Sequence, residues 1–142
     1  MQIHGSCVAR MGAAVLVTGP PGSGKSDLVL RLIDRGYMLV SDDRVDIDDR
    51  GAASPPESLA GLLEIRGLGI VRLPYRAGIK VALHIELGPQ GARLPPLAVQ
   101  DDVLGVPVVR LDPTHASAAA RVSLALECAL GGLGQIAGAF AA

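Results

Sequence analysis

The sequence predicts an α/β protein with a single, mostly buried sheet, and three observations support this fold class. Hydrophobic residues make up 49% of the 142 residues but aromatic residues only 2%, so the core has to be built from Leu, Val, Ile and Ala. Four apolar runs have the length and the β-branched content of strands, and an amphipathic segment follows the first of them. Since this length fits one ordinary domain, we expect residues 1–142 to form a single domain.

The first half of the chain reads as strand, loop, helix, strand, an order typical of α/β folds. The four predicted strands cover residues 13–18, 38–40, 81–87 and 106–111. Residues 26–35 have the helical period, because Leu28, Leu32 and Ile33 share one face. Gly36 follows this helix as a stop signal.

In the remaining segments, the presence or absence of residues that interrupt helices and strands predicts the local structure. Residues 48–57 (DDRGAASPPE) contain Asp, Gly, Ser and two prolines, which predicts a surface loop. Residues 113–130 are rich in Ala, Leu and Val and predict a long, mostly apolar helix. The small residues of 131–142 predict a tail that frays.

Charge and cysteine content exclude several classes of function. The formal net charge is −1 and the chain has only two lysines, so we expect no nucleic-acid partner. Cys7 and Cys128 lie in separate apolar contexts and are predicted to be buried free thiols, which fits a reducing cytoplasm. There is no signal-peptide pattern and no run of 18 apolar residues, so we expect a cytoplasmic protein without a membrane partner.

The segment GPPGSGKS matches the phosphate-loop pattern G-x-x-x-x-G-K-[ST], and it lies between a predicted strand and a predicted helix. The predicted nucleotide-binding residues are Gly19, Pro20, Pro21, Gly22, Ser23, Gly24, Lys25 and Ser26. Backbone N–H groups of such a loop surround a β-phosphate, the lysine reaches the β- and γ-phosphates, and the serine binds Mg²⁺. The alternative is a chance match in a glycine-rich turn. The correct flanks favour ATP and Mg²⁺ binding.

Two further segments carry carboxylates. Asp42 and Asp43 follow a predicted strand, so they emerge at the edge where α/β sheets bind ligands, and one of them is placed to act as a general base. The alternative is a solvated acidic turn. Glu64 and Arg66 lie on one face of an extended segment, where the carboxylate could join Ser26 on Mg²⁺ or form an exposed ion pair.

Two classes of phosphate-loop protein, GTPases and small-metabolite kinases, fit the sequence poorly. A GTPase needs an Asn/Thr-Lys-x-Asp motif, and the chain has no asparagine and no lysine in the threonine version of that motif. A small-metabolite kinase usually carries an arginine-rich lid, for which 142 residues leave little room. These observations favour a phosphotransferase of another kind.

The order of four motifs resembles the HPr kinase/phosphorylase family: HG at residues 4–5, the phosphate loop, the DD pair, and EIRGLGI at residues 64–70. The resemblance extends from about residue 4 to residue 73 and is weaker beyond. It implies a phosphate-loop fold similar to the nucleotide-binding core of phosphoenolpyruvate carboxykinase. It also implies a substrate, a serine of HPr, the small phosphocarrier protein of the sugar phosphotransferase system.

Site residues follow from the resemblance one by one. The family histidine falls on His4, and the loop lysine on Lys25. Of the DD pair, Asp43 would accept the serine proton, with Asp42 as its neighbour, and would protonate the leaving phosphate oxygen in the reverse reaction. The family's ligands of Mg²⁺ fall on Ser26 and Glu64, and its later catalytic arginine is matched to Arg93, where Pro95 replaces the family glycine.

The sequence also departs from the family. Family members carry an N-terminal domain without a counterpart here, so the chain resembles the short α-proteobacterial type. A PGRN segment tied to phosphorolysis and to subunit contacts has no counterpart either, since asparagine is absent. We therefore expect kinase activity rather than phosphorylase activity, and homo-oligomerisation is left open.

Three hypotheses follow in order. The first is an ATP- and Mg²⁺-dependent serine kinase acting on an HPr-like phosphocarrier. The second is a nucleotide-sensing module without turnover, and the third is a small-molecule kinase. His84 and His115 match no family position and are predicted to be structural.

Overall fold

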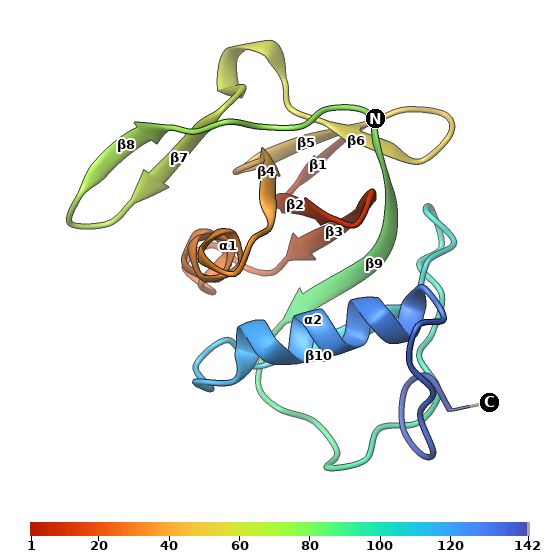
Figure 1. The fold of residues 1–142 in the computed structure, drawn as a ribbon. Coiled ribbons are helices and arrows are strands. Elements are labelled where there is room, and N and C mark those ends of the chain that lie inside the picture. Colours follow the sequence, from red (N-terminus) through yellow and green to blue (C-terminus); the bar gives the residue numbers. More distant parts are fainter. Residues whose placement is uncertain (142) are drawn as a thin grey trace.

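One long strand, β9 (Ile79–Leu87), organises the molecule, which is described for residues 1–141 in a computed structural model (Figure 1). Residues Ile79 and Lys80 pair antiparallel with β6 (Ala52–Ser54), whereas the rest of β9 pairs in parallel with β3 (Ala13–Thr18) on one side and β10 (Val108–Leu111) on the other. Strand pairing therefore changes from antiparallel to parallel along β9.

The other strands extend both parts of this sheet. They are β1 (Gln2–His4), β2 (Ser6–Arg10), β4 (Met38–Ser41) and β5 (Arg44–Ile47). The strand order is β1, β5, β6, β9, β3, β2, β4, with β10 beside β9, so eight strands of the described chain belong to one sheet. A separate hairpin of β7 (Leu62–Ile65) and β8 (Gly69–Arg72) projects from it, preceded by a short helix at Glu57–Leu59 (Figure 1).

Two helices cover one face of the sheet. In α1 (Lys25–Asp34), Leu28 and Leu32 are fully buried against it, as the helical period predicted. The second helix, α2 (Ala118–Ala129), buries Val122 and Leu126 in the same cluster. These aliphatic contacts supply most of the stabilising burial, at about 25 cal/mol per Å² of apolar surface removed from water.

The opposite face of the sheet packs on the β1–β5–β6 part. Its apolar cluster includes Leu16, Val40, Val45 and Ile47 together with Cys7. Burial raises the pKa of the Cys7 thiol, so it stays protonated. Both cysteines are free, but Cys128 is only half-buried, so the prediction of burial is confirmed for Cys7 and wrong for Cys128.

All four predicted strands are present, with bounds that differ by up to two residues, and so is the predicted first helix, which ends before Gly36 at φ 97°. The loop predicted at 48–57 is wrong in part, because it contains β6. The helix predicted at 113–130 begins only at Ala118, since Asp112 forms a turn with Thr114.

Whether the tail frays stays a prediction, and its residues 131–137 are exposed. Residues 131–141 hold no helix or strand, yet Phe140 packs on the helix-side core and the carbonyl of Ala139 accepts a hydrogen bond from Ala98 N at 2.9 Å. Residue 142 lies outside the described residues. Among residues 1–141, no helix is long and apolar enough to cross a lipid bilayer.

Candidate active site

The phosphate loop joins the end of β3 to the start of α1. Two glycines make its path feasible: Gly22 and Gly24 have φ values of 77° and 99°, in the left-handed region that other residues avoid. Gly24 is also the N-cap of α1 and supplies no side-chain cap. The first N–H groups of α1 therefore remain available to an anion, and the positive end of the helix favours one there.

Lys25 folds back over this loop. Its Nζ donates hydrogen bonds to the carbonyls of Gly19 at 2.8 Å and Pro20 at 3.0 Å. Ser23 Oγ lies buried in the same loop without a hydrogen-bond partner among the described residues. A buried hydroxyl of this kind is costly unless a ligand or water meets it, so the loop has the features of a built anion site.

Asp42 turns inward at the end of β4. Only 7% exposed, it accepts hydrogen bonds from Ser6 Oγ at 2.7 Å and from Ser26 Oγ at 2.9 and 3.1 Å. The carboxylate thus fixes the hydroxyl of Ser26, the last residue of the phosphate loop. Sequence reasoning treated Asp42 as the neighbour of a base and missed Ser6, which lies in no motif.

Asp43 turns the other way. Its φ of 70° is left-handed, which is unfavourable for a residue with a side chain. The tight turn is held by backbone hydrogen bonds, from Gly5 N to the Asp43 carbonyl at 3.0 Å and from Arg44 N to the Asp42 carbonyl at 2.8 Å. Adjacent carboxylates are thereby separated, with Asp42 buried and Asp43 exposed.

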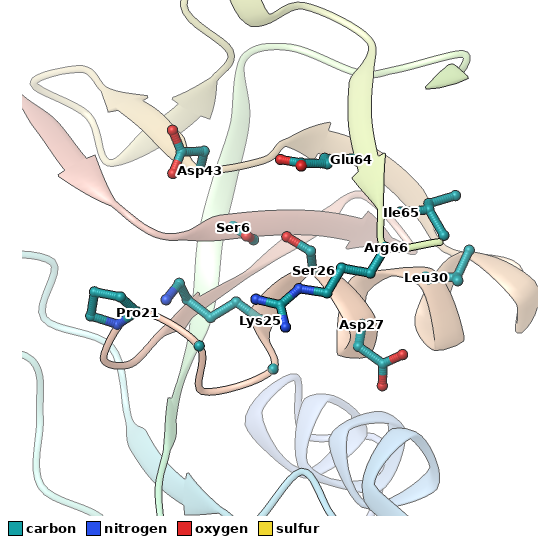
Figure 2. A pocket seen from close by; sticks show the side chains of 12 residues that line it. Ser6, Pro21, Lys25, Ser26, Asp27, Leu30, Asp43, Glu64, Ile65 and Arg66 are labelled. Atoms are coloured by element: carbon teal, nitrogen blue, oxygen red, sulfur yellow. The ribbon is translucent and has the colours of Figure 1, made fainter. Parts of the chain in front are cut away.

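The β7–β8 hairpin completes the site. Leu63 is fully buried in the helix-side core and anchors β7, so Glu64, its neighbour in the strand, points outward. Figure 2 shows Glu64 and Asp43 entering the same space as Ser26, with Arg66 extending toward the phosphate loop. These groups come from three separate segments of the chain: the start of α1, the corner after β4, and the β7–β8 hairpin.

The space between them is a cavity of about 540 Å³, which we call the acidic cavity. Its polar lining includes Lys25, Ser26, Asp27, Asp43, Glu64 and Arg66. Its volume lies within the range of roughly 300–1,000 Å³ that is typical of small-molecule sites.

The oxygen-bearing groups around the acidic cavity fit Mg²⁺. Ser26, Asp42, Asp43 and Glu64 supply oxygen atoms, the ligands that Mg²⁺ prefers. Residues 1–141 contain no group of three or more His, Cys, Asp or Glu side chains that could hold an ion by themselves. Mg²⁺ is characteristically held by one or two protein groups together with substrate phosphates, and this arrangement suits that mode.

Two residues carried over by resemblance are not brought to this cavity. His4 is exposed at the end of β1, paired in register with Arg44, and it does not line the cavity. It does lie next to Gly5, which bonds the Asp43 backbone. Arg93 is exposed in an irregular segment outside the cavity.

Comparisons with known proteins bear on the fold and the family. Residues 1–86 match the family model described as the HPr Serine kinase C-terminal domain. The structure is similar to one described as the Hpr(Ser) kinase/phosphatase from Coxiella burnetii, with a TM-score of 0.77 and 28% sequence identity, covering 92% of each chain. The fold is thus the phosphate-loop α/β fold of HPr kinase catalytic domains, similar to that of phosphoenolpyruvate carboxykinase, as the sequence predicted.

Curated relatives are longer proteins. The chain is 35% identical over 125 residues to the HPr kinase/phosphorylase of Clostridium tetani, an alignment covering 78% of this chain and 41% of that protein. It is 37% identical over 117 residues to the HPr kinase/phosphorylase of Bacillus subtilis, covering 73% of this chain and 38% of that one. The chain thus spans about two-fifths of the length of the relatives that it matches.

Proposed function

The chain belongs to the family of HPr serine kinase C-terminal domains, and from that premise we propose that it is a cytoplasmic, ATP- and Mg²⁺-dependent kinase that phosphorylates a serine of an HPr-type phosphocarrier protein. The observation that supports this best is the convergence of Lys25, Ser26, Asp43 and Glu64 on the acidic cavity. A phosphate-binding lysine, two candidate ligands of Mg²⁺ and an accessible carboxylate are the groups that phosphoryl transfer to an alcohol requires.

In this proposal the phosphate loop positions the donor. The N–H groups at the start of α1 and the ammonium group of Lys25 bind the β- and γ-phosphate oxygens. Ser26 and Glu64 hold Mg²⁺, which neutralises charge on those oxygens when it is bound. Asp42 keeps the hydroxyl of Ser26 oriented through the bonds at 2.9 and 3.1 Å.

Asp43 acts on the acceptor. Its carboxylate orients the serine hydroxyl of the carrier and takes its proton as the serine oxygen bonds to the γ-phosphorus and the bond to the leaving ADP breaks. The left-handed turn supports this role, because it presents the carboxylate to the cavity instead of to the core. Roles for His4 and Arg93 stay predictions from the family resemblance.

The test is transfer of label. Purified protein is incubated with γ-labelled ATP, Mg²⁺ and an HPr-type carrier, beside Lys25→Ala and Asp43→Ala variants. We expect label on a serine of the carrier with the unsubstituted protein and none with either variant. ATP binding without any label on the carrier would contradict the kinase proposal and favour a nucleotide-sensing module.

Excess inorganic phosphate is then added to the labelled carrier. We expect the label to stay, since the chain has no counterpart of the family's PGRN segment. Loss of label that depends on the protein would show that it also works as a phosphorylase.

A further inference from the structure

A second cavity lies on the other side of the phosphate loop. It has a volume of about 670 Å³ and is lined by residues of the loop itself, by the ends of β9 and β10 with Glu86 and Arg110, and by the segments that follow these strands with Pro89 and Pro113. We call it the strand-end cavity. Pro21 and Gly22 line both cavities, so a ligand held by the phosphate loop has access to both.

The polar groups of the strand-end cavity are placed by strand register. Thr18, Glu86 and Arg110 are partners across β3, β9 and β10, three adjacent parallel strands. All three residues line the cavity, at the carboxyl ends where α/β sheets bind ligands. The register therefore sets one hydroxyl, one carboxylate and one guanidinium in a row beside the loop.

The hydroxyl of Thr18 is held in place by a chain of hydrogen bonds through His84 and Asp101. Thr18 Oγ1 lies 2.6 Å from His84 Nε2, and His84 Nδ1 lies 2.8 Å from Asp101 Oδ2. The other oxygen of Asp101 accepts hydrogen bonds from the N–H groups of Val103 and Leu104, both at 2.8 Å. His84 thereby fixes the hydroxyl of Thr18 at the cavity wall, and its predicted structural role stays a prediction.

The charge of the row suits a neutral polar ligand. Glu86 and Arg110 pair at 3.2 Å, and no other cationic side chain lines this cavity among the described residues. An anion would find no uncompensated positive charge here, whereas phosphates have the loop and Lys25. Both members of the pair are about half exposed, so their remaining hydrogen-bonding capacity faces the cavity and solvent.

The walls suit a flat, partly apolar group. Pro89 follows β9 and Pro113 follows β10, and both line the cavity. Gly88 leaves room for Arg110, because a methyl group there would lie 2.9 Å from its Nη1. Pro113 is held to α1 by a hydrogen bond from Arg31 Nη2 to its carbonyl at 2.8 Å. The planar guanidinium of an arginine stacks well on planar rings, and the prolines add apolar surface to the wall.

We infer that the strand-end cavity binds the nucleoside part of the phosphoryl donor, with the Glu86 carboxylate accepting hydrogen bonds from the ribose hydroxyls and Arg110 lying against the base. The inference rests on the proposed function, which puts the γ-phosphate in the acidic cavity beside Asp43 and Glu64. A nucleotide whose terminal phosphate lies there extends its other end past Pro21 and Gly22 into the strand-end cavity.

The test compares donors with and without a nucleoside. Binding of ATP, of inorganic tripolyphosphate and of dideoxy-ATP, which lacks the ribose hydroxyls, is measured by calorimetry in the presence of Mg²⁺. The proteins are the unsubstituted chain, Glu86→Ala, and Glu57→Ala as a matched control, since Glu57 is an exposed glutamate that lines neither cavity.

We expect Glu86→Ala to weaken ATP binding about tenfold, the cost of a lost hydrogen bond to a charged group. Tripolyphosphate binding should not change, and Glu57→Ala should bind every ligand as the unsubstituted chain does. The unsubstituted chain should prefer ATP to dideoxy-ATP, and Glu86→Ala should lose that preference. A purely structural role of Glu86 would leave the preference intact.

Equal weakening of ATP and tripolyphosphate by Glu86→Ala, or no weakening of either, would overturn the inference. Failure of the proposed function has a different mark: label from γ-labelled ATP would not reach the carrier, whatever calorimetry shows. An unsubstituted chain that binds neither ATP nor tripolyphosphate would lack the phosphate site itself, and the inference would fall with it. Tripolyphosphate bound as tightly as ATP by the unsubstituted chain would leave the phosphate site standing and overturn the nucleoside site alone.

Discussion

The acidic cavity and the strand-end cavity flank one phosphate loop but are built in different ways. The acidic cavity takes its groups from sequence motifs on α1, on the corner after β4 and on β7. The strand-end cavity takes Thr18, Glu86 and Arg110 from equivalent positions of three paired strands, and Glu86 and Arg110 belong to no motif. Reactive groups are therefore readable as local patterns, whereas groups that position a ligand can depend on strand register alone.

Substitution of Lys25 should have the largest effect and should affect ligands of both cavities, because the phosphate loop lines both. Lys25→Ala should lower kcat/KM for transfer to the carrier by about 1,000-fold or more, since the ammonium group stabilises charge on the transferred phosphate. It should weaken ATP and tripolyphosphate binding alike. Lys80→Ala, at the chain's other lysine, is the matched control for steady-state kinetics, because Lys80 is exposed on β9 away from both cavities.

Asp43 sharpens the contrast from the acidic side. Asp43→Asn should lower kcat by about 100-fold, because the amide cannot take the serine proton. Binding of ATP and of tripolyphosphate should stay as it was, which calorimetry would check beside single-turnover transfer. Asp49→Asn, in an exposed turn, is the control. Full activity of Asp43→Asn would remove Asp43 from the role of base.

Asp101 tests the comparison on the side of the strand-end cavity, and the quantity measured is the free energy of unfolding. Burial acts to raise the pKa of Asp101, but hydrogen bonds from Leu104, Val103 and His84 outweigh it and hold that pKa below its ordinary value. The lowered pKa means that the carboxylate stabilises the fold fully above pH ~4 and that this contribution is lost as pH falls through the pKa of the folded state.

Asp101→Asn should therefore lower the free energy of unfolding by about 1–2 kcal/mol at pH 7. The difference from the unsubstituted chain should shrink as pH falls below ~4. Urea unfolding at a series of pH values measures it, with Asp102→Asn as control, since Asp102 is the exposed neighbour. A difference that is independent of pH would show that the carboxylate charge is not what stabilises this segment.

The smallest effect concerns the backbone of Asp43. Glycine accepts a φ of 70° without strain, so Asp43→Gly should raise the free energy of unfolding by about 0.5–1 kcal/mol while it abolishes transfer. Thermal unfolding measures the gain. Asp49→Gly should be destabilising, because Asp49 does not have a left-handed φ. A destabilised Asp43→Gly would mean that the turn carries no strain.

Much of the fold was predictable because its central elements are locally encoded. The apolar runs that form β3 and β9 and the period of α1 are legible without the rest of the chain. β1, β5 and β6 were missed because they are short and depend in part on distant partners, β5 for β1 and β9 for β6. β2, β7 and β8 were not predicted either. In β6, Ala52 and Ala53 have weak strand preference, and the pairing with β5 and β9 overrides the turn residues around them.

The same distinction holds for the site: residues in local motifs were predicted, and a residue that depends on tertiary contacts was not. The phosphate loop, the aspartate pair and Glu64 were found as motifs. The structure brings the loop, Asp43 and Glu64 around one cavity, whereas Asp42 is buried and bonds Ser26. Ser6 was missed, because a serine on a buried strand gives no signal until Asp42 is seen 2.7 Å away. His4 and Arg93 were carried over from motif order and lie outside the acidic cavity.

The hydrogen bond between Thr18 and His84 joins residues 66 positions apart. β9, which pairs with β3, therefore leaves the ribosome well after β3. Closing so long a loop is entropically costly until the contacts between the two strands offset that cost. Until β9 is available, the strand that carries the phosphate loop has an open edge. We therefore expect the phosphate loop to reach its final position only after β9 has paired with β3, and a nascent chain that ends before residue 87 to expose an open strand edge.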